Sequence, residues 1–316
     1  MVSYVFLLCG GLVNASNLVS KTNTLIGTQG NGWASGYLYP GATYPFGMVQ
    51  FTPTYFTKQL GFVINQLSGA GCDHMGNFPT LPIAGALRVS PDSILNMQTP
   101  VGKEIGTAGY YAATVDHSIR AELTVTERTG MARYTFSSKE KQGTVIIGGG
   151  VAATSIQVAA IKITGPHSCE GYAEGGAFCG IPTPYKVYFV AEFDADAESF
   201  GTWKEERLHA NHTFAEGSHS GVYFTFPLKE GNQAVQYKIG VSYVSVENAR
   251  ENLRVENPAW DFSAVRQATQ DKWNEYLGKI EVEGDNEDRQ MQFYTHLYRS
   301  LTVSYTHLTL PTNSLV

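Results

Sequence analysis

The stretch "AVQYKIGVSYVS", residues 234–245, alternates apolar and polar side chains along its length. Its apolar face is formed by Val235, Tyr237, Ile239, Val241 and Tyr243. Gln236 and Lys238 fall on the opposite face. Because successive side chains of a strand point to opposite faces, this alternation predicts a β-strand with one face in a core. The stretch "PYKVYFVAEFD", residues 184–194, repeats the pattern.

The same period-two pattern recurs from about residue 110 to residue 245, with clusters of Gly, Pro, Asn or Asp between the strands. Charged residues make up 16% of the chain and aromatic residues 12%, and 33 of the 316 residues are Gly. A composition low in charge and rich in turn residues favours an all-β protein over a helical bundle. We therefore expect a mainly β protein built as a large antiparallel β-sandwich.

The pattern changes after Val246, where helical periodicity replaces the alternation. Asp261 or Ser263 is the expected N-cap of a helix that ends at Gly278. A second helix is expected to begin near Asp285. Its apolar face is formed by Tyr294, Leu297, Tyr298 and Leu301.

The two ends of the chain differ from the rest in character. Residues 1–16 form a short apolar run with a small-residue exit, typical of a signal peptide, although a buried N-terminal strand is the alternative. The run is shorter than the roughly 20 apolar residues of a membrane span. Residues 304–316 resemble tails left by adapter read-through in assembled environmental DNA, so we expect an artefactual tail; a natural short tail is the alternative. We assign residues 17–258 to the sandwich and residues 259–303 to a helical linker.

Charge and cysteine content exclude some functions and leave others open. The formal net charge is −6 and the basic residues are scattered, which gives no electrostatic footprint for nucleic acid. Cys169 and Cys179 lie in a loop-like stretch and could form a disulfide in an exported protein. The cysteine spacing does not favour a zinc site.

Two glycine-rich stretches of low charge carry the functional signal. They are "YPGATYPFGMVQFTP", residues 39–53, and "GFVINQLSGAGCDHMGNFPTLP", residues 61–82. Each is either a set of core strands with tight corners or a loop shaped to lie against a ligand. Extended to "NTLIGTQGNGWASGYLYPGATYPFGMVQFTP", residues 23–53, the first resembles the start of glycoside hydrolase family 92, the calcium-dependent exo-α-mannosidases. The second resembles the same family's L-S-G-x-G-C signature, and "FYTHLYRSL" is similar to a later landmark.

The resemblance implies a two-part enzyme in which an N-terminal β-sandwich leads, through linker helices, to a C-terminal (α/α)6 barrel that this sequence does not include. Family members invert configuration, which needs an acid and a base about 6.5–9.5 Å apart. Calcium, held by oxygen ligands, assists at the sugar. Acid, base and calcium ligands belong mainly to the barrel, so we assign no catalytic residue and no metal ligand here. We expect calcium in the absent catalytic domain and none bound by this chain.

Five residues near the glycine-rich stretches are candidates for contact with a sugar: Trp33, Ser68, Cys72, Asp73 and Asn77. Trp33 offers a flat face for stacking on a sugar, with a core position under the loop as the alternative. Ser68, Asp73 and Asn77 supply hydrogen-bonding groups that suit a polyol, although Asp73 could instead cap a turn. Nothing near Cys72 in sequence would lower its pKa, so a nucleophile is not expected there, and a small buried filler is the alternative.

The resemblance thus implies the N-terminal fragment of an inverting exo-α-mannosidase, secreted or periplasmic, that acts on terminal α-mannosyl residues of mannan or N-glycans. The fragment itself is expected to be inactive. Its partners would be mannose-containing glycans and the C-terminal barrel, with no nucleic acid and no membrane span. The alternative is a standalone carbohydrate-binding β-sandwich module. Against that alternative, such a module would expose the apolar face of the second helix without a partner.

Overall fold

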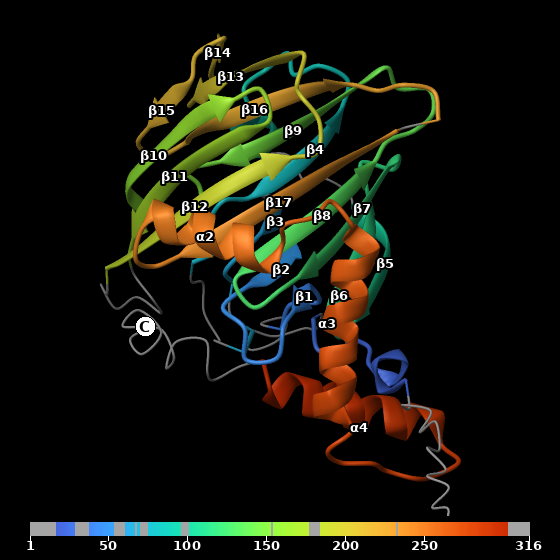
Figure 1. The fold of residues 1–316 in the computed structure, drawn as a ribbon. Coiled ribbons are helices and arrows are strands. Elements are labelled where there is room, and N and C mark those ends of the chain that lie inside the picture. The colour runs from blue at the N-terminus through green and yellow to red at the C-terminus, as the bar shows by residue number, and fades with distance from the viewer. Residues whose placement is uncertain are drawn as a thin grey trace, which may run out of the picture.

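Two β-sheets face each other as the layers of a sandwich, with helices along one side and at one end (Figure 1). This computed structural model describes residues 17–28, 38–53, 61–66, 68–69, 75–95, 101–152, 154–176, 184–231 and 233–302. Neighbouring strands pair antiparallel in both sheets. The expectation of a mainly β protein, with a large antiparallel sandwich followed by helices, is confirmed.

The two sheets are described by their strand order. The first runs β1 (Ala42–Thr43), β2 (Gln50–Pro53), β3 (Phe62–Val63), β4 (Thr80–Ala84), β9 (Gln142–Gly148), β16 (Ser220–Pro227), β13 (Ser199–Lys204) and β14 (Arg207–Ala210). The second runs β15 (Phe214–Glu216), β10 (Ile156–Gly165), β11 (Ser168–Gly175), β12 (Tyr185–Phe193), β17 (Ala234–Ser242), β8 (Thr129–Thr135), β7 (Ile119–Val125), β6 (Tyr110–Val115) and β5 (Val101–Thr107). A short helix, α1 (Pro91–Leu95), follows β4.

The core lies between the sheets and is rich in aromatic rings. In β17 the predicted inner face is buried, with Tyr237 at 0% exposure. Across the sandwich, Phe193 of β12 lies 5.0 Å from Phe224 of β16 between ring centroids. Tyr134 of β8 shares a hydrogen bond of 2.8 Å with Thr80 of β4, so a polar contact also joins the two layers.

The outer face of β17 is covered as well. Lys238, on that face, is only 2% exposed because α2 (Val246–Glu256) and the segment after it lie over the strand. Its Nζ donates to the carbonyl of Asn257 at 2.9 Å and lies 4.0 Å from the centre of the Trp260 ring. Burial lowers the pKa of Lys238. The alternation alone did not indicate that both faces of this strand would be covered.

Two longer helices follow α2, close to the expected positions. The first, α3 (Phe262–Leu277), begins after Asp261, whose carboxylate accepts from the backbone N–H of Ala264 at 2.9 Å. Asp261, rather than Ser263, is therefore the N-cap. The second, α4 (Glu287–Ser300), begins after Asn286, next to the expected Asp285.

The apolar face of α4 is covered inside this chain. Tyr294 and Tyr298 are 1% and 0% exposed. They pack with Trp273 and Leu277 of α3 and with the N-terminal turn η1 (Leu18–Lys21). The expectation that this face would lack a partner is wrong, because the stretch before residue 23 folds back onto the helices. Because this face is covered within the chain, it does not count against a standalone carbohydrate-binding module.

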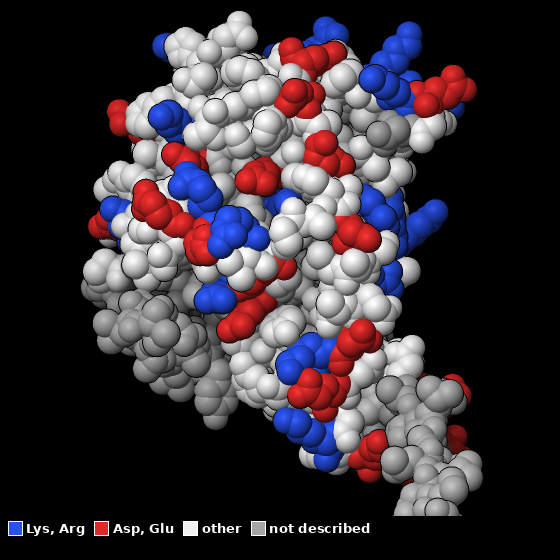
Figure 2. All heavy atoms as spheres, in the orientation of Figure 1, with Lys and Arg blue, Asp and Glu red and all other residues white. Residues whose placement is uncertain are grey.

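The surface carries both signs of charge. On the face that Figure 2 shows, Lys and Arg side chains lie among Asp and Glu side chains without a large field of one sign. This agrees with the scattered charges of the sequence. Among the residues that the structure describes, no helix has the length and apolar character needed to cross a bilayer.

The contact between α2 and β17 yields a test of packing. A Cβ added at Gly240 would lie 2.3 Å from the carbonyl oxygen of Ala249 and 2.9 Å from Cβ of Leu253, so α2 would have to shift. We expect Gly240→Ala to lower the free energy of unfolding by about 1–3 kcal/mol, measured by urea denaturation. Gly102→Ala is the matched control, since no atom lies within 4 Å of its added Cβ. Equal midpoints for the two variants would contradict the packing.

The buried tyrosine between the sheets predicts a pH dependence. Burial raises the pKa of Tyr134 well above its ordinary value. Above about pH 10 the unfolded chain loses this proton while the folded chain keeps it, so the phenol's contribution to stability falls as pH rises. We expect the wild type to lose about 1 kcal/mol of stability relative to Tyr134→Phe between pH 10 and pH 11, because the unfolded phenol is about half ionised at pH 10 and about 90% ionised at pH 11. Urea midpoints at pH 9, 10 and 11 measure it, and a constant difference would refute the assignment.

Candidate functional site

The two glycine-rich stretches lie next to each other in the fold. The first contributes β1 and β2 and the second contributes β3 and β4, and these four strands are consecutive in the first sheet. A bridge between Gln50 and Asn65 joins the stretches where the strands end. The described parts of the stretches thus contribute short strands that are neighbours in one sheet.

Ser68 joins the two stretches through its hydroxyl group. It is 3% exposed. Its Oγ accepts from the backbone N–H of Tyr39 at 3.2 Å and donates to Oε1 of Gln50 at 3.4 Å. Ser68, one of the five candidates for contact with a sugar, is therefore buried and already hydrogen-bonded within the protein.

Asn77 is fully buried, at 0% exposure, and pairs with Asn65. The backbone N–H of Asn77 donates to Oδ1 of Asn65 at 2.7 Å, and Nδ2 of Asn65 donates to Oδ1 of Asn77 at 3.0 Å. The hydroxyl of Tyr185 donates to the same Oδ1 at 2.9 Å. Asn77 therefore links the second stretch to the start of β12 in the other sheet. Within the described residues its Nδ2 has no partner.

Two further side chains, Asn65 and Tyr243, belong to this polar cluster, and the sequence alone did not single them out. Asn65 also donates to the hydroxyl of Tyr243 at 3.3 Å. Gln66 follows Asn65 in the chain and is 0% exposed, and within the described part of the chain neither its Nε2 nor its Oε1 has a hydrogen-bond partner. Two adjacent amide residues, two positions before Ser68, were the available signal. The contacts of Tyr185 and Tyr243 cross from one sheet to the other, which a sequence pattern does not encode.

The cluster is electrically neutral. It consists of amides and hydroxyls, and no carboxylate takes part in the contacts described. Burial raises the pKa of Tyr243 to about 12 and also raises the pKa of Tyr185. Both phenols therefore stay protonated at neutral pH. Such groups can hold the hydroxyls of a polyol, but they do not supply the acid–base pair of a hydrolase.

The remaining candidates lie outside the described residues. These are Trp33, Cys72 and Asp73, whose roles stay predictions. Cys169 is a buried free thiol, and burial raises its pKa, which makes it a poor nucleophile. Cys179 is also outside the described residues.

Carboxylates elsewhere in the described structure are engaged in structural contacts. Glu122 accepts from the hydroxyl of Tyr110 and from Nε of Arg133, both at 2.8 Å. Glu256 accepts from Oγ1 of Thr126 at 2.6 Å and from the backbone N–H of Arg128 at 2.8 Å. These contacts tie the ends of strands to neighbouring elements.

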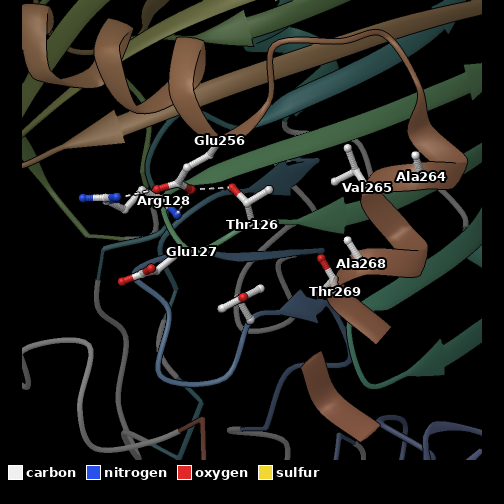
Figure 3. Close-up of a pocket in the computed structure, with 9 residues that line it drawn as sticks. Thr126, Glu127, Arg128, Glu256, Ala264, Val265, Ala268 and Thr269 are labelled. Atoms are coloured by element: carbon white, nitrogen blue, oxygen red, sulfur yellow. Dashed lines mark hydrogen bonds and ion pairs between the residues drawn. The ribbon is translucent and has the colours of Figure 1, made fainter. Parts of the chain in front are cut away.

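Figure 3 shows Glu256 at the edge of a pocket of about 400 Å³ between the β7–β8 turn and α3. The α3 side of this pocket is apolar, with Ala264, Val265 and Ala268. The Glu256 carboxylate points to Thr126 and Arg128 rather than standing free, so it fastens α2 to the turn. Glu256 is therefore not available as a free acid or base in this pocket.

The described residues do not fit a calcium site. Ca²⁺ takes six to eight oxygen ligands, usually several of them carboxylates. No group of three or more His, Cys, Asp or Glu side chains suited to a metal occurs among the described residues. The oxygens of Ser68 and Asn77 already accept protein donors.

Two family models match the chain in succession. The model of the glycosyl hydrolase family 92 N-terminal domain matches residues 22–242. The model of the glycosyl hydrolase family 92 catalytic domain matches residues 248–309, which include α2, α3 and α4. Our division at residue 258 stays a prediction.

The known proteins compared below are longer than this chain. A protein of Arthroderma benhamiae described as an uncharacterized secreted glycosidase is 27% identical over 95% of this chain and 45% of its own length. A family GH92 α-mannosidase of Bacteroides thetaiotaomicron superposes with a TM-score of 0.78 at 24% identity, covering 89% of this chain and 41% of that one. An inverting GH92 mannosidase of B. thetaiotaomicron VPI-5482 gives 0.77 at 24% identity, with 90% and 39% covered.

The chain therefore spans less than half the length of these relatives. The solved structures share its fold at low identity, whereas the N-terminal family model matches well over half of its residues in sequence. The chain belongs to glycosyl hydrolase family 92.

Proposed function

We propose that this chain is the N-terminal, sugar-facing part of an inverting exo-α-mannosidase that removes terminal α-mannosyl residues from mannan or N-glycans. The observation that carries the proposal is the order of the two family matches, N-terminal domain and then catalytic domain, on a sandwich whose two signature stretches meet. A similar solved α-mannosidase was obtained in complex with mannoimidazole, which supports a mannose-like ligand. The relative described as secreted supports an exported protein.

The chemistry is divided between two parts of the protein. Inversion requires a general acid and a general base about 6.5–9.5 Å apart, with a water molecule between them. The buried side chains of Asn65, Ser68 and Asn77 are hydrogen-bonded within the protein, so their role is to hold the two signature stretches in place behind the surface that meets the sugar. The proton-transferring carboxylates and the calcium ligands belong to the remainder of the catalytic domain.

The first prediction concerns turnover. We expect the purified 316-residue chain to leave a chromogenic α-mannoside uncleaved, with or without calcium, because we place the acid–base pair in the remainder of the catalytic domain. The same chain extended by the remainder of a family 92 catalytic domain is expected to cleave it and to lose activity on addition of a chelator. Calcium-dependent turnover by the 316-residue chain would refute this division. An inactive extended chain, with mannose bound tightly by the short one, would favour the carbohydrate-binding module.

A further prediction concerns Gln66, whose side-chain amide has no hydrogen-bond partner among the residues that the structure describes. A buried polar group without a partner costs stability, so we expect Gln66→Leu to keep or raise the free energy of unfolding, by up to about 1 kcal/mol. The same variant should bind methyl α-mannoside more weakly in an NMR titration. Gln50→Leu is the matched control, because Gln50 accepts from Ser68 and its loss should destabilise the protein. If both variants lose stability equally, the Gln66 amide serves the fold and not the sugar.

A further inference from the structure

Arg299, near the end of α4, places its guanidinium in the interior, where the group donates hydrogen bonds to main-chain carbonyls. The residue is 7% exposed. Its Nη1 donates to the carbonyl of Tyr39 at 2.8 Å. Its Nη2 donates to the carbonyls of Thr24 and Ile26 at 2.5 and 3.4 Å. One guanidinium thus holds three carbonyls of the first signature stretch.

Burying the guanidinium of Arg299 costs free energy, because the charged group loses its hydration. None of the ion pairs found among the described residues includes Arg299. Burial lowers the pKa of Arg299. Desolvating a guanidinium without a carboxylate is unfavourable, and the planar donor fork recovers part of that cost only if several carbonyls stay fixed around it.

One of the three carbonyls, that of Tyr39, belongs to a residue that is connected to the candidate site. Tyr39, which gives its carbonyl to Arg299, gives its backbone N–H to Oγ of Ser68. Ser68 in turn donates to Gln50. A continuous path of hydrogen bonds therefore runs from the guanidinium through the Tyr39 residue to the second signature stretch.

Neighbouring contacts hold the adjacent part of the same stretch. The hydroxyl of Tyr298 lies 2.8 Å from Oγ1 of Thr43, and Nε1 of Trp273 donates to the carbonyl of Thr43 at 2.7 Å. The rings of Trp273 and Tyr298 are 4.7 Å apart. α3 and α4 therefore hydrogen-bond to β1 directly, and Arg299 adds hydrogen bonds to Tyr39 and to residues 24 and 26.

We propose that Arg299 is a positioning residue. Through it α4, which belongs to the region matched by the catalytic-domain model, fixes the geometry of the part of the sugar site that the sandwich forms. The proposal rests on the proposed function for the meaning of the site. The physical claim is that Arg299 fixes the spacing between residues 24–26 and Tyr39, and thereby the place of Ser68. Arg299 itself touches no substrate in this assignment.

Hydrogen exchange of the 316-residue chain tests the claim without any sugar or turnover. In Arg299→Lys, a single ammonium replaces the fork, so the amides of Ile26 and Tyr39 should exchange about tenfold faster. The amide of Ile239, in the β17–β8 pairing, should be unchanged. Arg289→Lys on the exposed side of α4 is the matched control and should alter neither segment.

Chemical rescue separates positioning from general loss of packing. In Arg299→Ala, millimolar methylguanidinium should restore the slow exchange of Ile26 and Tyr39. Failure of rescue in a folded variant, or acceleration of Ile239 to the same extent, would overturn the proposal. If Arg299→Ala does not fold, the Arg299→Lys exchange pattern decides alone.

The extended enzyme gives a separate readout. There Arg299→Lys should raise KM for a chromogenic α-mannoside about tenfold while kcat falls less, because the residue places a binding surface and not the acid–base pair. A fall in kcat at unchanged KM would overturn the positioning role. If hydrogen exchange responds as expected but the extended enzyme cleaves no mannoside, the proposed function is refuted. The positioning contact of Arg299 would still stand.

Discussion

Each sheet has one face that must be kept from water, and each covers the face of the other. This mutual burial sets the rest of the architecture. Rings such as Phe193 and Phe224 fill the space between the layers, so strands on both sides must keep their register for the rings to meet. The short strands β1 to β4 lie side by side at one edge of the first sheet, which brings the described parts of the two signature stretches together.

The sandwich could be predicted from the sequence because alternation is a local property. The faces of β12 and β17 followed from neighbouring residues in the chain. Lys238 shows where this reasoning stops, since its burial depends on Trp260 and Asn257, which fold back from the next element. The face of α4 shows the same limit: the turn that covers Tyr294 lies more than 250 residues earlier in the chain.

The candidate site was predictable only in part, for the same reason. Ser68 and Asn77 could be selected as polar residues in a glycine-rich stretch. Their partners could not, because the contact between Asn77 and Tyr185 spans 108 residues and that between Asn65 and Tyr243 spans 178. The neutral character of the cluster became visible only when these partners were known. The neutral groups of the cluster supply no acid–base pair for hydrolysis.

The pairing of residues 18–24 with the last helices has a consequence for synthesis. The backbone N–H of Val19 is bound by Asn274, 255 residues later, and the carbonyl of Thr24 by Arg299, 275 residues later. At about 5–20 residues per second, a ribosome needs roughly 15–55 s to make the partner of Thr24. During that time the N-terminal segment lacks its contacts with the helices, although Pro40, Gly106 and Ala108, which also bind residues 22–24, are made much earlier. The order of translation therefore makes the helix contacts the last native contacts of the N-terminal segment to form.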